Sequence, residues 1–306
     1  MRVVFAGTPE AAVPTLRRLV DGPHEVVAVV TRPDAPQGRK RVLTPSPVAA
    51  AASELGLTVI KAARLDDEAT AAVTAQHPDL GVVVAYGGLV REPLLSAPEH
   101  GWINLHFSDL PRWRGAAPVQ RALIAGDETL GACVFSLVPA LDAGDVYARL
   151  DYEPPAMATA GDVLDALAHR GAYLVADVVD ALAAGTAHAT PQEGEPTHAP
   201  KLTIDDGRLD FDEPAERVLA RFRGVTPEPG AHTTVGGSPL KILSARPADR
   251  ADGLAPGRIA QGDDGVLFGT ATAPIAVERV QPAGKGAMDA AAWWRGLRID
   301  DPVAGA

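Results

Sequence analysis

The first 185 residues alternate between short apolar runs and longer segments in which apolar residues recur with helical spacing. The short runs predict strands, and the longer segments predict helices between them. Ser46 is expected to be the N-cap of the helix that begins at residue 47. The run Leu80–Tyr86 is apolar throughout, as expected at the centre of a parallel sheet. Strands are expected at 2–6, 25–31, 59–61, 80–86, 102–105, 130–137 and 145–152, and helices at 10–21, 47–55, 66–76, 117–125 and 161–184. This order predicts an α/β domain with a Rossmann-like, mostly parallel sheet.

The periodic pattern fades after residue 185. The segment 186–205 is rich in Pro, Thr, Glu and Gly, which is the composition of a linker. Beyond it one helix is expected at 213–222, and short β-like runs separated by Gly and Pro turns follow at 232–235, 240–243, 265–268 and 275–280. Short strands at this spacing predict a small barrel. The expected organisation is an N-terminal domain (1–185), a linker (186–205) and a C-terminal β domain (206–306).

The composition is that of a soluble globular protein, because 46% of the 306 residues are apolar and 22% are charged. No apolar run approaches the roughly 20 residues of a membrane-spanning helix, and the N-terminus lacks the pattern of a signal peptide. The one cysteine, Cys133, excludes an internal disulfide and lies in a predicted strand. The histidines are scattered, so no metal site is expected. These features predict a cytoplasmic protein without a membrane anchor.

The net charge of −11 argues against a protein that coats nucleic acids in general, since such proteins are basic. An RNA partner would therefore require positive charge concentrated in one region. The segment 32–47 offers it, with four prolines and four basic residues, three of which, Arg39, Lys40 and Arg41, follow Gly38 directly. On composition alone, this basic tip is equally compatible with a solvated surface loop.

The candidate chemistry lies in the stretch 101–115. Successive side chains alternate along a strand, so Asn104 and His106 project from the same face near its carboxyl end, where open α/β sheets bind ligands. The amide can donate to a developing oxyanion and the imidazole can move a proton. A carboxylate from elsewhere should complete the set, and Asp142 in the turn 141–145 is the candidate. On spacing alone, an Asn-x-His pair is more often hydrogen-bonded scaffold than catalytic machinery.

The complete string changes this interpretation. Asn-x-His is followed by Ser-x-Leu-Pro-x-Trp-Arg-Gly-Ala-Ala-Pro and, 36 residues after His106, by Leu-Asp-x-Gly-Asp. Together with the opening Phe-Ala-Gly-Thr-Pro-Glu, this pattern resembles the formyltransferases that use 10-formyltetrahydrofolate, and within them the methionyl-tRNA formyltransferases. The resemblance covers essentially the whole chain and is loose after about residue 225. It implies the formyltransferase fold, with an OB-like barrel as the C-terminal domain.

The resemblance implies an acyl transfer to an amine. The formyl group of 10-formyltetrahydrofolate, the co-substrate, would pass to the α-amino group of methionine on initiator tRNA, for translation initiation. Asn104 would donate to the formyl oxygen, and Asp142 would pair with His106, raise its pKa and help to deprotonate the amine. His106 would either stabilise the oxyanion as an imidazolium or pass the proton to the departing nitrogen. No metal is required.

The resemblance also implies two groups of folate-binding residues. Tyr86, Gly87 and Leu89 would line the pterin pocket through backbone groups. Four further residues would form a wall beside the folate: Ser108, Asp109, Leu110 and Pro111. Asp109 stands where the family has Leu, so its carboxylate either weakens folate binding or points outward, which is the interpretation we favour. Arg91 stands where the family tends to have Pro.

For the tRNA, the resemblance implies that the loop 32–47 wedges into the acceptor arm. Arg39 falls at the position of the family's key arginine, with Lys40 and Arg41 beside it, and Lys285 belongs to a late signature in the C-terminal domain. Glu228 replaces a Trp of the family and removes a possible stacking contact. The protein is expected to act as a monomer.

Three other functions compete with this one. A formyltransferase acting on a small amine, such as glycinamide ribonucleotide or an amino sugar nucleotide, would need neither the basic loop 32–47 nor a C-terminal barrel. A folate- or nucleotide-binding module without turnover would not need Asn104, His106 and Asp142 together. A plain tRNA-binding protein fits poorly with the acidic N-terminal half.

Overall fold

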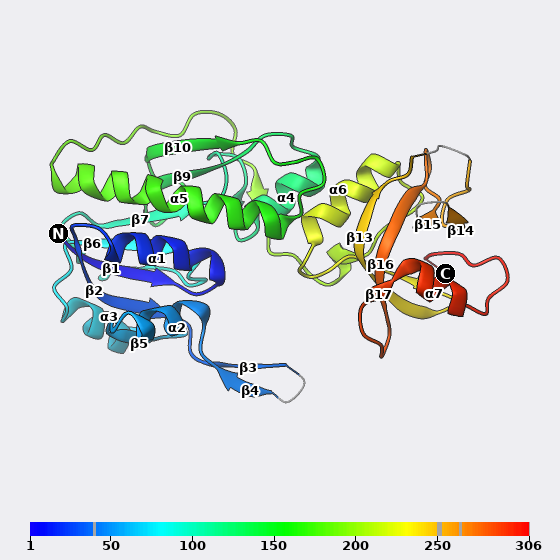
Figure 1. Cartoon of the computed structure of the whole chain (residues 1–306). Coiled ribbons are helices and arrows are strands. Elements are labelled where there is room, and N and C mark those ends of the chain that lie inside the picture. The colour runs from blue at the N-terminus through cyan, green and yellow to red at the C-terminus, as the bar shows by residue number, and fades with distance from the viewer. Residues whose placement is uncertain (39–40, 250–252, 263–264, 306) are drawn as a thin grey trace. The chain divides into compact units, whose positions relative to one another are not determined.

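The computed structural model describes residues 1–38, 41–249, 253–262 and 265–305 (Figure 1). The chain forms two compact units. The first contains residues 1–118, 129–152 and 164–199, and the second contains residues 119–128, 153–163 and 200–306. Within the described ranges, none of the helices combines the length and the apolar character that crossing a bilayer requires.

The first unit is built on a seven-stranded sheet with the order β10-β9-β7-β6-β1-β2-β5. The five strands from β5 to β7 are parallel, and β9 and β10 continue the sheet in antiparallel pairs. This confirms the predicted Rossmann-like, mostly parallel sheet. The strands are β1 (Arg2–Gly7), β2 (Glu25–Thr31), β5 (Val59–Lys61), β6 (Leu80–Val84), β7 (Trp102–His106), β9 (Leu130–Ser136) and β10 (Val146–Tyr152).

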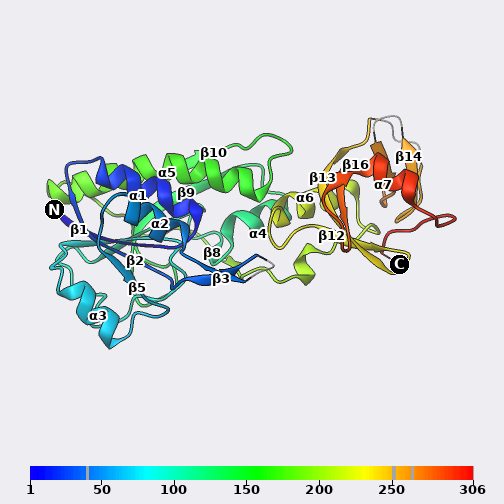
Figure 2. The same ribbon diagram turned by 60° about the horizontal axis from the view of Figure 1, so that its bottom comes forward.

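The helices of the first unit lie at the predicted places. Between the parallel strands lie α1 (Val13–Val20), after the short 3-10 turn Glu10–Ala12, α2 (Pro47–Glu54) and α3 (Asp67–Thr74), and the long α5 (Ala160–Ala183) follows β10. Figure 2 shows α3 beside the edge strand β5. On α5, Gly171 lies so close to the Leu105 side chain that an added Cβ would come within 2.7 Å of it. A small residue at this position therefore lets α5 pack closely on β7.

The interior of the sheet is shaped by one large side chain. Trp102 on β7 is 1% exposed and lies across Gly81 on β6, where a Cβ would come within 2.1 Å of the indole. The indole Nε1 donates to the carbonyl oxygen of Leu94 at 2.9 Å, so the ring is buried without losing its hydrogen bond. This packing fixes β7, the strand that carries Asn104 and His106, against β6.

The direction of the chain reverses at β1. The chain passes outward from β1 to β2 and β5, and then returns to place β6 and β7 on the other side of β1. The carboxyl ends of β1 and β6 are tied together by Thr8, whose hydroxyl donates to the carbonyl oxygen of Tyr86 at 3.0 Å. Ligands of open α/β sheets bind outside the carboxyl ends of the strands at such a reversal.

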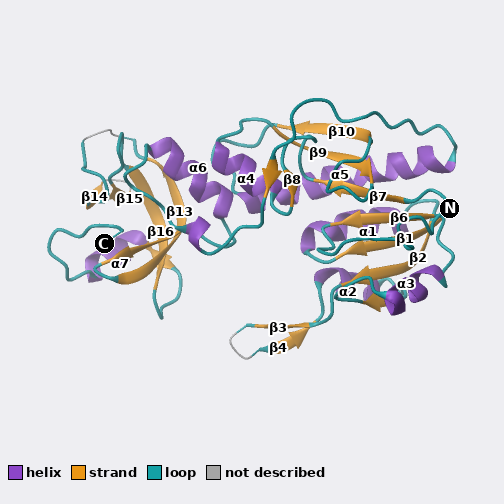
Figure 3. Ribbon diagram, turned by 180° about the vertical axis from the view of Figure 1, so that it is seen from behind, coloured by secondary structure: helices purple, strands orange, loops and turns teal. Residues whose placement is uncertain are grey.

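The segment 32–47 contains a hairpin that the sequence pattern did not predict. The strands β3 (Ala35–Gln37) and β4 (Val42–Thr44) pair in antiparallel register, and the hairpin projects from the sheet (Figures 1 and 3). Val42 and Leu43 are 60% and 67% exposed. Strands of three residues, one of them containing a proline, are too short to show an alternating pattern.

The second unit is an antiparallel sheet with the order β12-β13-β16-β15-β14, to which β17 adds beside β16. The strands are β12 (His232–Val235), β13 (Ser238–Pro247), β14 (Ile259–Gly262), β15 (Gly265–Phe268), β16 (Ile275–Pro282) and β17 (Met288–Asp289), and the helices are α4 (Pro118–Ala125), α6 (Ala215–Val225) and α7 (Ala290–Gly296). The sheet curls around an apolar core that includes Phe211, Phe222 and Phe268. The predicted OB-like C-terminal domain is thus confirmed, although β14, β17 and α7 were not predicted.

The two edges of this curled sheet are joined by the last residues of the chain. Ala304 forms a bridge with Val235 at the end of β12, and Val303 forms one with Arg258 before β14. The Ala304 amide also donates to Gly257 at 2.7 Å, and the Ile259 amide donates to Pro302 at 3.1 Å. The C-terminal segment therefore occupies the gap between the edge strands and satisfies their backbone groups.

The segment expected as a linker, 186–205, makes ordered contacts with the first unit as far as Ala199. His198–Ala199 forms the short strand β11, which pairs with β8 (Arg114–Gly115). Thr190 exchanges both backbone hydrogen bonds with Val146 on β10, at 2.8 and 2.9 Å. These contacts place residues 190–199 beside the loop that follows His106.

The predicted N-cap of α2 is present and allows a test of the local folding argument. The Ser46 hydroxyl accepts from the Ala49 amide at 3.0 Å and lies 2.6 Å from the buried Thr31 hydroxyl. Ser46→Ala should lower the free energy of unfolding by about 1–3 kcal/mol, because it removes a cap and leaves the Thr31 hydroxyl unpaired. Urea unfolding measures the change. Ser53→Ala, at an exposed position of α2, is the control, and equal losses in the two variants would contradict the assignment.

Candidate active site

Strand β7 places Asn104 and His106 at its carboxyl end. Asn104 lies between Val83 on β6 and Phe135 on β9, and His106 lies opposite Cys133 on β9. The two residues are two positions apart in one strand and therefore share a face of the sheet, as the sequence pattern predicts.

His106 is 6% exposed and makes a hydrogen bond that defines its tautomer. Its Nε2 lies 2.9 Å from the carbonyl oxygen of Trp113, which can only accept, so Nε2 carries the proton and Nδ1 is the basic nitrogen of the neutral ring. The edge of the Phe135 ring lies against the imidazole, with the ring centroids 6.2 Å apart. Burial lowers the pKa of His106, while the Asp142 charge and the Trp113 carbonyl oppose this shift. The ring is therefore neutral at pH 7.

Asn104 is half-buried, and its amide has spare hydrogen-bonding capacity. In the described part of the chain, its side-chain oxygen is one of the few buried polar atoms without a hydrogen-bond partner. A buried polar group left in this state costs about 1–3 kcal/mol. Such an amide, next to a neutral histidine, is suited to a bound polar ligand.

Asp142 lies in the turn between β9 and β10, with a left-handed backbone conformation (φ 45°). Its Oδ2 accepts from the Gly115 amide at 2.7 Å, and its charge acts on His106 electrostatically. The turn packs tightly on β9, since a Cβ at Gly144 would come within 1.8 Å of the carbonyl oxygen of Ser136. The sequence-based candidates Asn104, His106 and Asp142 are thus brought together in one site.

Three residues around this site have positive φ angles although they are not glycines. Ala85 (46°) follows β6, Trp113 (61°) accepts the His106 hydrogen bond, and Asp142 (45°) carries the candidate carboxylate. Such conformations cost about 1–3 kcal/mol each and persist where the surrounding structure enforces them. Backbone strain of this kind is consistent with a candidate site at the carboxyl edge of the sheet.

The loop after β7 is held by its own side chains. The buried Ser108 hydroxyl donates to the carbonyl oxygen of Arg112 at 2.6 Å. Leu110 is 1% exposed and packs against Cys133, Phe135 and Val146, and Pro111 next to it is also buried. These predicted folate-binding residues therefore fix the shape of the loop, and contacts to a ligand would come from the loop as a whole.

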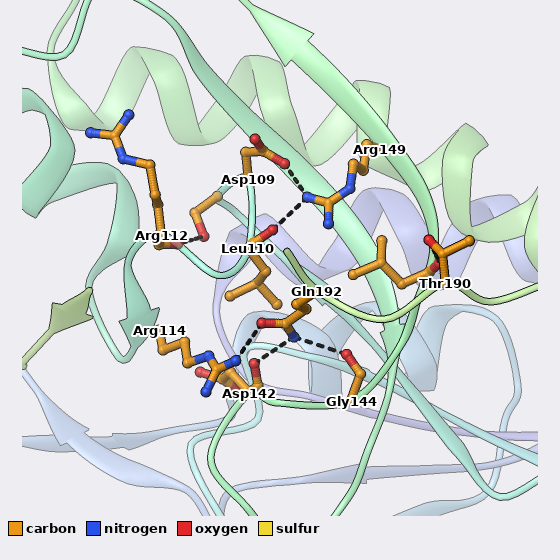
Figure 4. A network of polar contacts seen from close by, with 11 residues as sticks. Asp109, Leu110, Arg112, Arg114, Asp142, Gly144, Arg149, Thr190 and Gln192 are labelled. Atoms are coloured by element: carbon orange, nitrogen blue, oxygen red, sulfur yellow. Dashed lines mark hydrogen bonds and ion pairs between the residues drawn. The ribbon is translucent and has the colours of Figure 1, made fainter. Parts of the chain in front are cut away.

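Asp109 points away from this packed interior. Its side chain is 59% exposed and forms an ion pair with the guanidinium of Arg149 on β10 (Figure 4). The same guanidinium nitrogen donates to the carbonyl oxygen of Leu110 at 2.6 Å. The outward orientation favoured by the sequence analysis agrees with this arrangement.

The second predicted folate-binding segment follows β6. Tyr86 is 1% exposed and its hydroxyl donates to the carbonyl oxygen of Ala62 at 2.8 Å, so its side chain belongs to the core. Burial raises the pKa of the Tyr86 hydroxyl, which keeps it a hydrogen-bond donor. The Gly87 carbonyl oxygen accepts from Arg32 at 2.9 Å, and Leu89 is 60% exposed.

Comparisons with known proteins assign this arrangement to a family. The family described as "Formyl transferase" matches residues 1–179, and "Formyl transferase, C-terminal domain" matches residues 201–298. The methionyl-tRNA formyltransferase of Clavibacter sepedonicus is 60% identical over 304 residues, which cover 99% of this chain and all of the relative. That of Leifsonia xyli subsp. xyli is 60% identical over 296 residues, 97% of each chain.

The chain belongs to the methionyl-tRNA formyltransferase family. This confirms the family that the motifs predicted. A solved N-formyltransferase of Helicobacter canadensis, in complex with folinic acid and dTDP-3-aminofucose, has the same fold, with a TM-score of 0.70 over 92% of this chain and 98% of that one. At 15% identity, this likeness extends to the fold alone.

The residues predicted to bind tRNA in this member of the methionyl-tRNA formyltransferase family are placed only in part. Arg39 and Lys40 lie outside the described residues. Arg41 is exposed directly before β4, with a left-handed conformation (φ 50°). Lys285 is exposed in the turn between β16 and β17, where the Gln281 side chain donates to its carbonyl oxygen at 3.0 Å.

Several residues of the site were not predicted. Arg114 and Gln192 are joined by a hydrogen bond of 2.6 Å, and the Thr197 hydroxyl accepts from the Trp113 amide at 2.8 Å. Arg149 lies on β10 and holds the loop after β7. The segment 186–199 has no periodic pattern, so no signal in the sequence indicated that it would contact the site.

The burial of a neutral His106 predicts a pH dependence of stability. The folded-state pKa lies below 6.5, the ordinary histidine value, so the unfolded chain takes up the proton first as the pH falls. The neutral buried imidazole therefore adds nothing unfavourable to folding above pH 6.5. As the pH falls below 6.5, protonation of His106 in the unfolded chain lowers the free energy of unfolding. His106→Gln should reduce the loss of stability between pH 7.5 and pH 5.5, measured by urea unfolding at both values. Identical pH dependences of the two proteins would contradict the assignment.

Proposed function

We propose that this protein transfers the formyl group of 10-formyltetrahydrofolate to the α-amino group of methionyl initiator tRNA. The observation that carries the proposal is the 60% identity, over almost the entire chain, to proteins named methionyl-tRNA formyltransferase. The site supports it, because Asn104, His106 and Asp142 lie together at the carboxyl end of the sheet. The product would be formylmethionyl-tRNA for translation initiation.

The transfer forms a bond between the α-amino nitrogen and the formyl carbon and breaks the bond from that carbon to N10 of the folate. The amine loses one proton, N10 gains one, and the formyl oxygen carries negative charge in between. Asn104 would donate to this oxygen through its side-chain NH₂ group, from a position on β7 that is fixed between β6 and β9. Pre-positioned donors of this kind are effective because they need no reorganisation during the reaction.

The neutral state of His106 favours a proton-transfer role over a standing imidazolium. Its Nε2–H is held by Trp113, which leaves Nδ1 to accept the proton of the amine and to pass it on. The Asp142 charge stabilises the imidazolium that forms transiently, as its effect on the pKa of His106 indicates. Of the two roles that the sequence left open, the structure therefore supports the transfer of a proton.

The co-substrate is assigned to the same edge of the sheet. The residues that would hold 10-formyltetrahydrofolate are the loop 108–111 and the backbone of Gly87 to Leu89. The buried side-chain oxygen of Asn104 lacks a hydrogen-bond partner among the described residues and would be satisfied by an N–H of a bound substrate, while the NH₂ group of the same amide would donate to the formyl oxygen. The Asp109 carboxylate does not oppose an apolar folate surface, since it is solvated and paired with Arg149.

The fold alone does not select the acceptor, because the Helicobacter canadensis protein with dTDP-3-aminofucose has the same fold. The relatives of 60% identity favour tRNA. Arg39, Lys40 and Arg41 of the segment 32–47 and Lys285 in the second unit are proposed as the tRNA contacts, and the exposure of Arg41 and Lys285 is compatible with this role. The monomeric state and the cytoplasmic location stay predictions.

The reaction is tested by formyl transfer from 10-formyltetrahydrofolate, with methionyl initiator tRNA and glycinamide ribonucleotide as competing acceptors. The native protein should formylate the tRNA only. Asn104→Ala should lower kcat by about 100- to 1,000-fold, because the developing oxyanion loses its donor. Asn104→Ala should still bind folate. Transfer to the small amine, or full activity of the variant, would contradict the proposal.

The hairpin is tested through the salt dependence of tRNA binding. Arg39→Ala and Arg41→Ala should each weaken tRNA binding and reduce the slope of log K against log salt by about 0.7–0.9, if each arginine contacts one phosphate. The KM for 10-formyltetrahydrofolate should not change. Arg64→Ala, at an exposed position of the same unit, is the control. Salt slopes that match this control in both hairpin variants would exclude the contact.

A further inference from the structure

Gln192 occupies the centre of a closed ring of hydrogen bonds around Asp142 (Figure 4). Its side-chain NH₂ group donates to the carbonyl oxygens of Asp142 at 2.9 Å and Gly144 at 2.8 Å. Its side-chain oxygen accepts from Arg114 at 2.6 Å. Gly115, the neighbour of Arg114, donates its amide to the Asp142 carboxylate at 2.7 Å.

From this geometry we infer that Gln192 is a positioning residue of the formyl transfer: it fixes the backbone of Asp142 so that the carboxylate faces His106. The inference rests on the proposed function. It gives the segment 186–199 a role in the active site that linker composition does not indicate. Gln192 itself would touch neither the folate nor the acceptor.

The chemistry of an amide suits this position. Both hydrogens of the NH₂ group are used by carbonyl oxygens of the turn, and the oxygen is used by a cation. A glutamate would place an oxygen against two carbonyl oxygens, and an apolar residue would leave the Arg114 guanidinium without this partner. Gln therefore satisfies a set of donors and acceptors that other side chains of its size do not.

The segment that carries Gln192 is anchored on both sides of it. On one side, Thr190 exchanges two backbone hydrogen bonds with Val146. On the other, the Arg114 amide donates to Thr197 at 2.8 Å and the Ala116 amide donates to Ala199 at 2.9 Å. Gln192 therefore reaches the turn from a fixed backbone, which is required of a residue that positions another one.

The turn needs this support because of its backbone conformation. Asp142 has a φ of 45°, and Gly144 has no room for a Cβ beside Ser136. Gly115 donates its amide to the carboxylate and has a φ of 119°. A Cβ added to Gly115 would come within 2.8 Å of the carbonyl oxygen of Ala199. Without the two hydrogen bonds from Gln192, the strained turn is free to relax and to move the carboxylate away from His106.

The charge on Asp142 is the feature through which Gln192 acts on the reaction. Asp142 provides the charge that raises the pKa of His106 against the effect of burial. Cys133, which lies opposite His106 on β9, has a pKa raised by burial to about 12 and stays neutral. A displaced Asp142 should therefore lower the pKa of His106 further.

The test compares Gln192→Met with the native protein. Methionine keeps the length and approximate volume of the side chain and removes its polar atoms, and Gln192→Ala is the second variant should the first not fold. Glu193→Ala, at the exposed neighbouring position, is the matched control. The readouts are kcat and KM for formyl transfer and the NMR titration of the His106 ring in ¹³C-histidine protein.

Gln192→Met should lower kcat by about 10- to 100-fold with an unchanged KM for 10-formyltetrahydrofolate, and should shift the His106 titration to lower pH. In an Asp142→Asn background, the same substitution should have no further effect on either readout. Additive losses in the double variant, or a native His106 titration in Gln192→Met, would overturn the inference. The titration requires no turnover, so a failure of the proposed function is recognised separately, by a native protein that does not formylate the tRNA.

Discussion

The burial of a neutral imidazole at the end of β7 is the constraint on which the rest of the site depends. Removing His106 from water lowers its pKa, and the Trp113 carbonyl fixes the proton on Nε2. A buried ring of this kind can accept a proton only if a nearby charge stabilises the cation that results. Asp142 supplies that charge, so the carboxylate must be held close to the ring without being neutralised itself.

This requirement explains why the surrounding backbone is strained and tightly packed. Trp113 and Asp142, on the two segments next to His106, both have left-handed conformations, and Gly115 and Gly144 lie where a Cβ would collide with a backbone oxygen. Strain of about 1–3 kcal/mol per residue persists only where packing and hydrogen bonds enforce it. The segment 190–199 contributes to this enforcement, since Thr197 accepts from the Trp113 amide and Gln192 donates to the Asp142 carbonyl oxygen.

The parts of this structure that local patterns specify could be predicted from the sequence. The period of two along 102–106 placed Asn104 and His106 on one face, and runs such as Leu80–Tyr86 located the parallel strands. The contacts of the candidate site residues could not be predicted, because they join residues far apart: Gln192 meets Asp142 from 50 positions away, and Arg149 meets Asp109 from 40. The closure of the second sheet by Ala304 is non-local in the same way.

The position of Asp109 follows the same physical logic. Leu110 points into the core while Asp109 beside it points into solvent, so the apolar packing of the loop rests on Leu110. An ion pair as exposed as Asp109–Arg149 contributes about 0–1 kcal/mol, too little to be the reason for the loop's shape. Arg149 also binds the Leu110 carbonyl oxygen, and this contact does not require Asp109. The loop therefore accommodates a solvated carboxylate at position 109, because its form is set by the residues on its inner side.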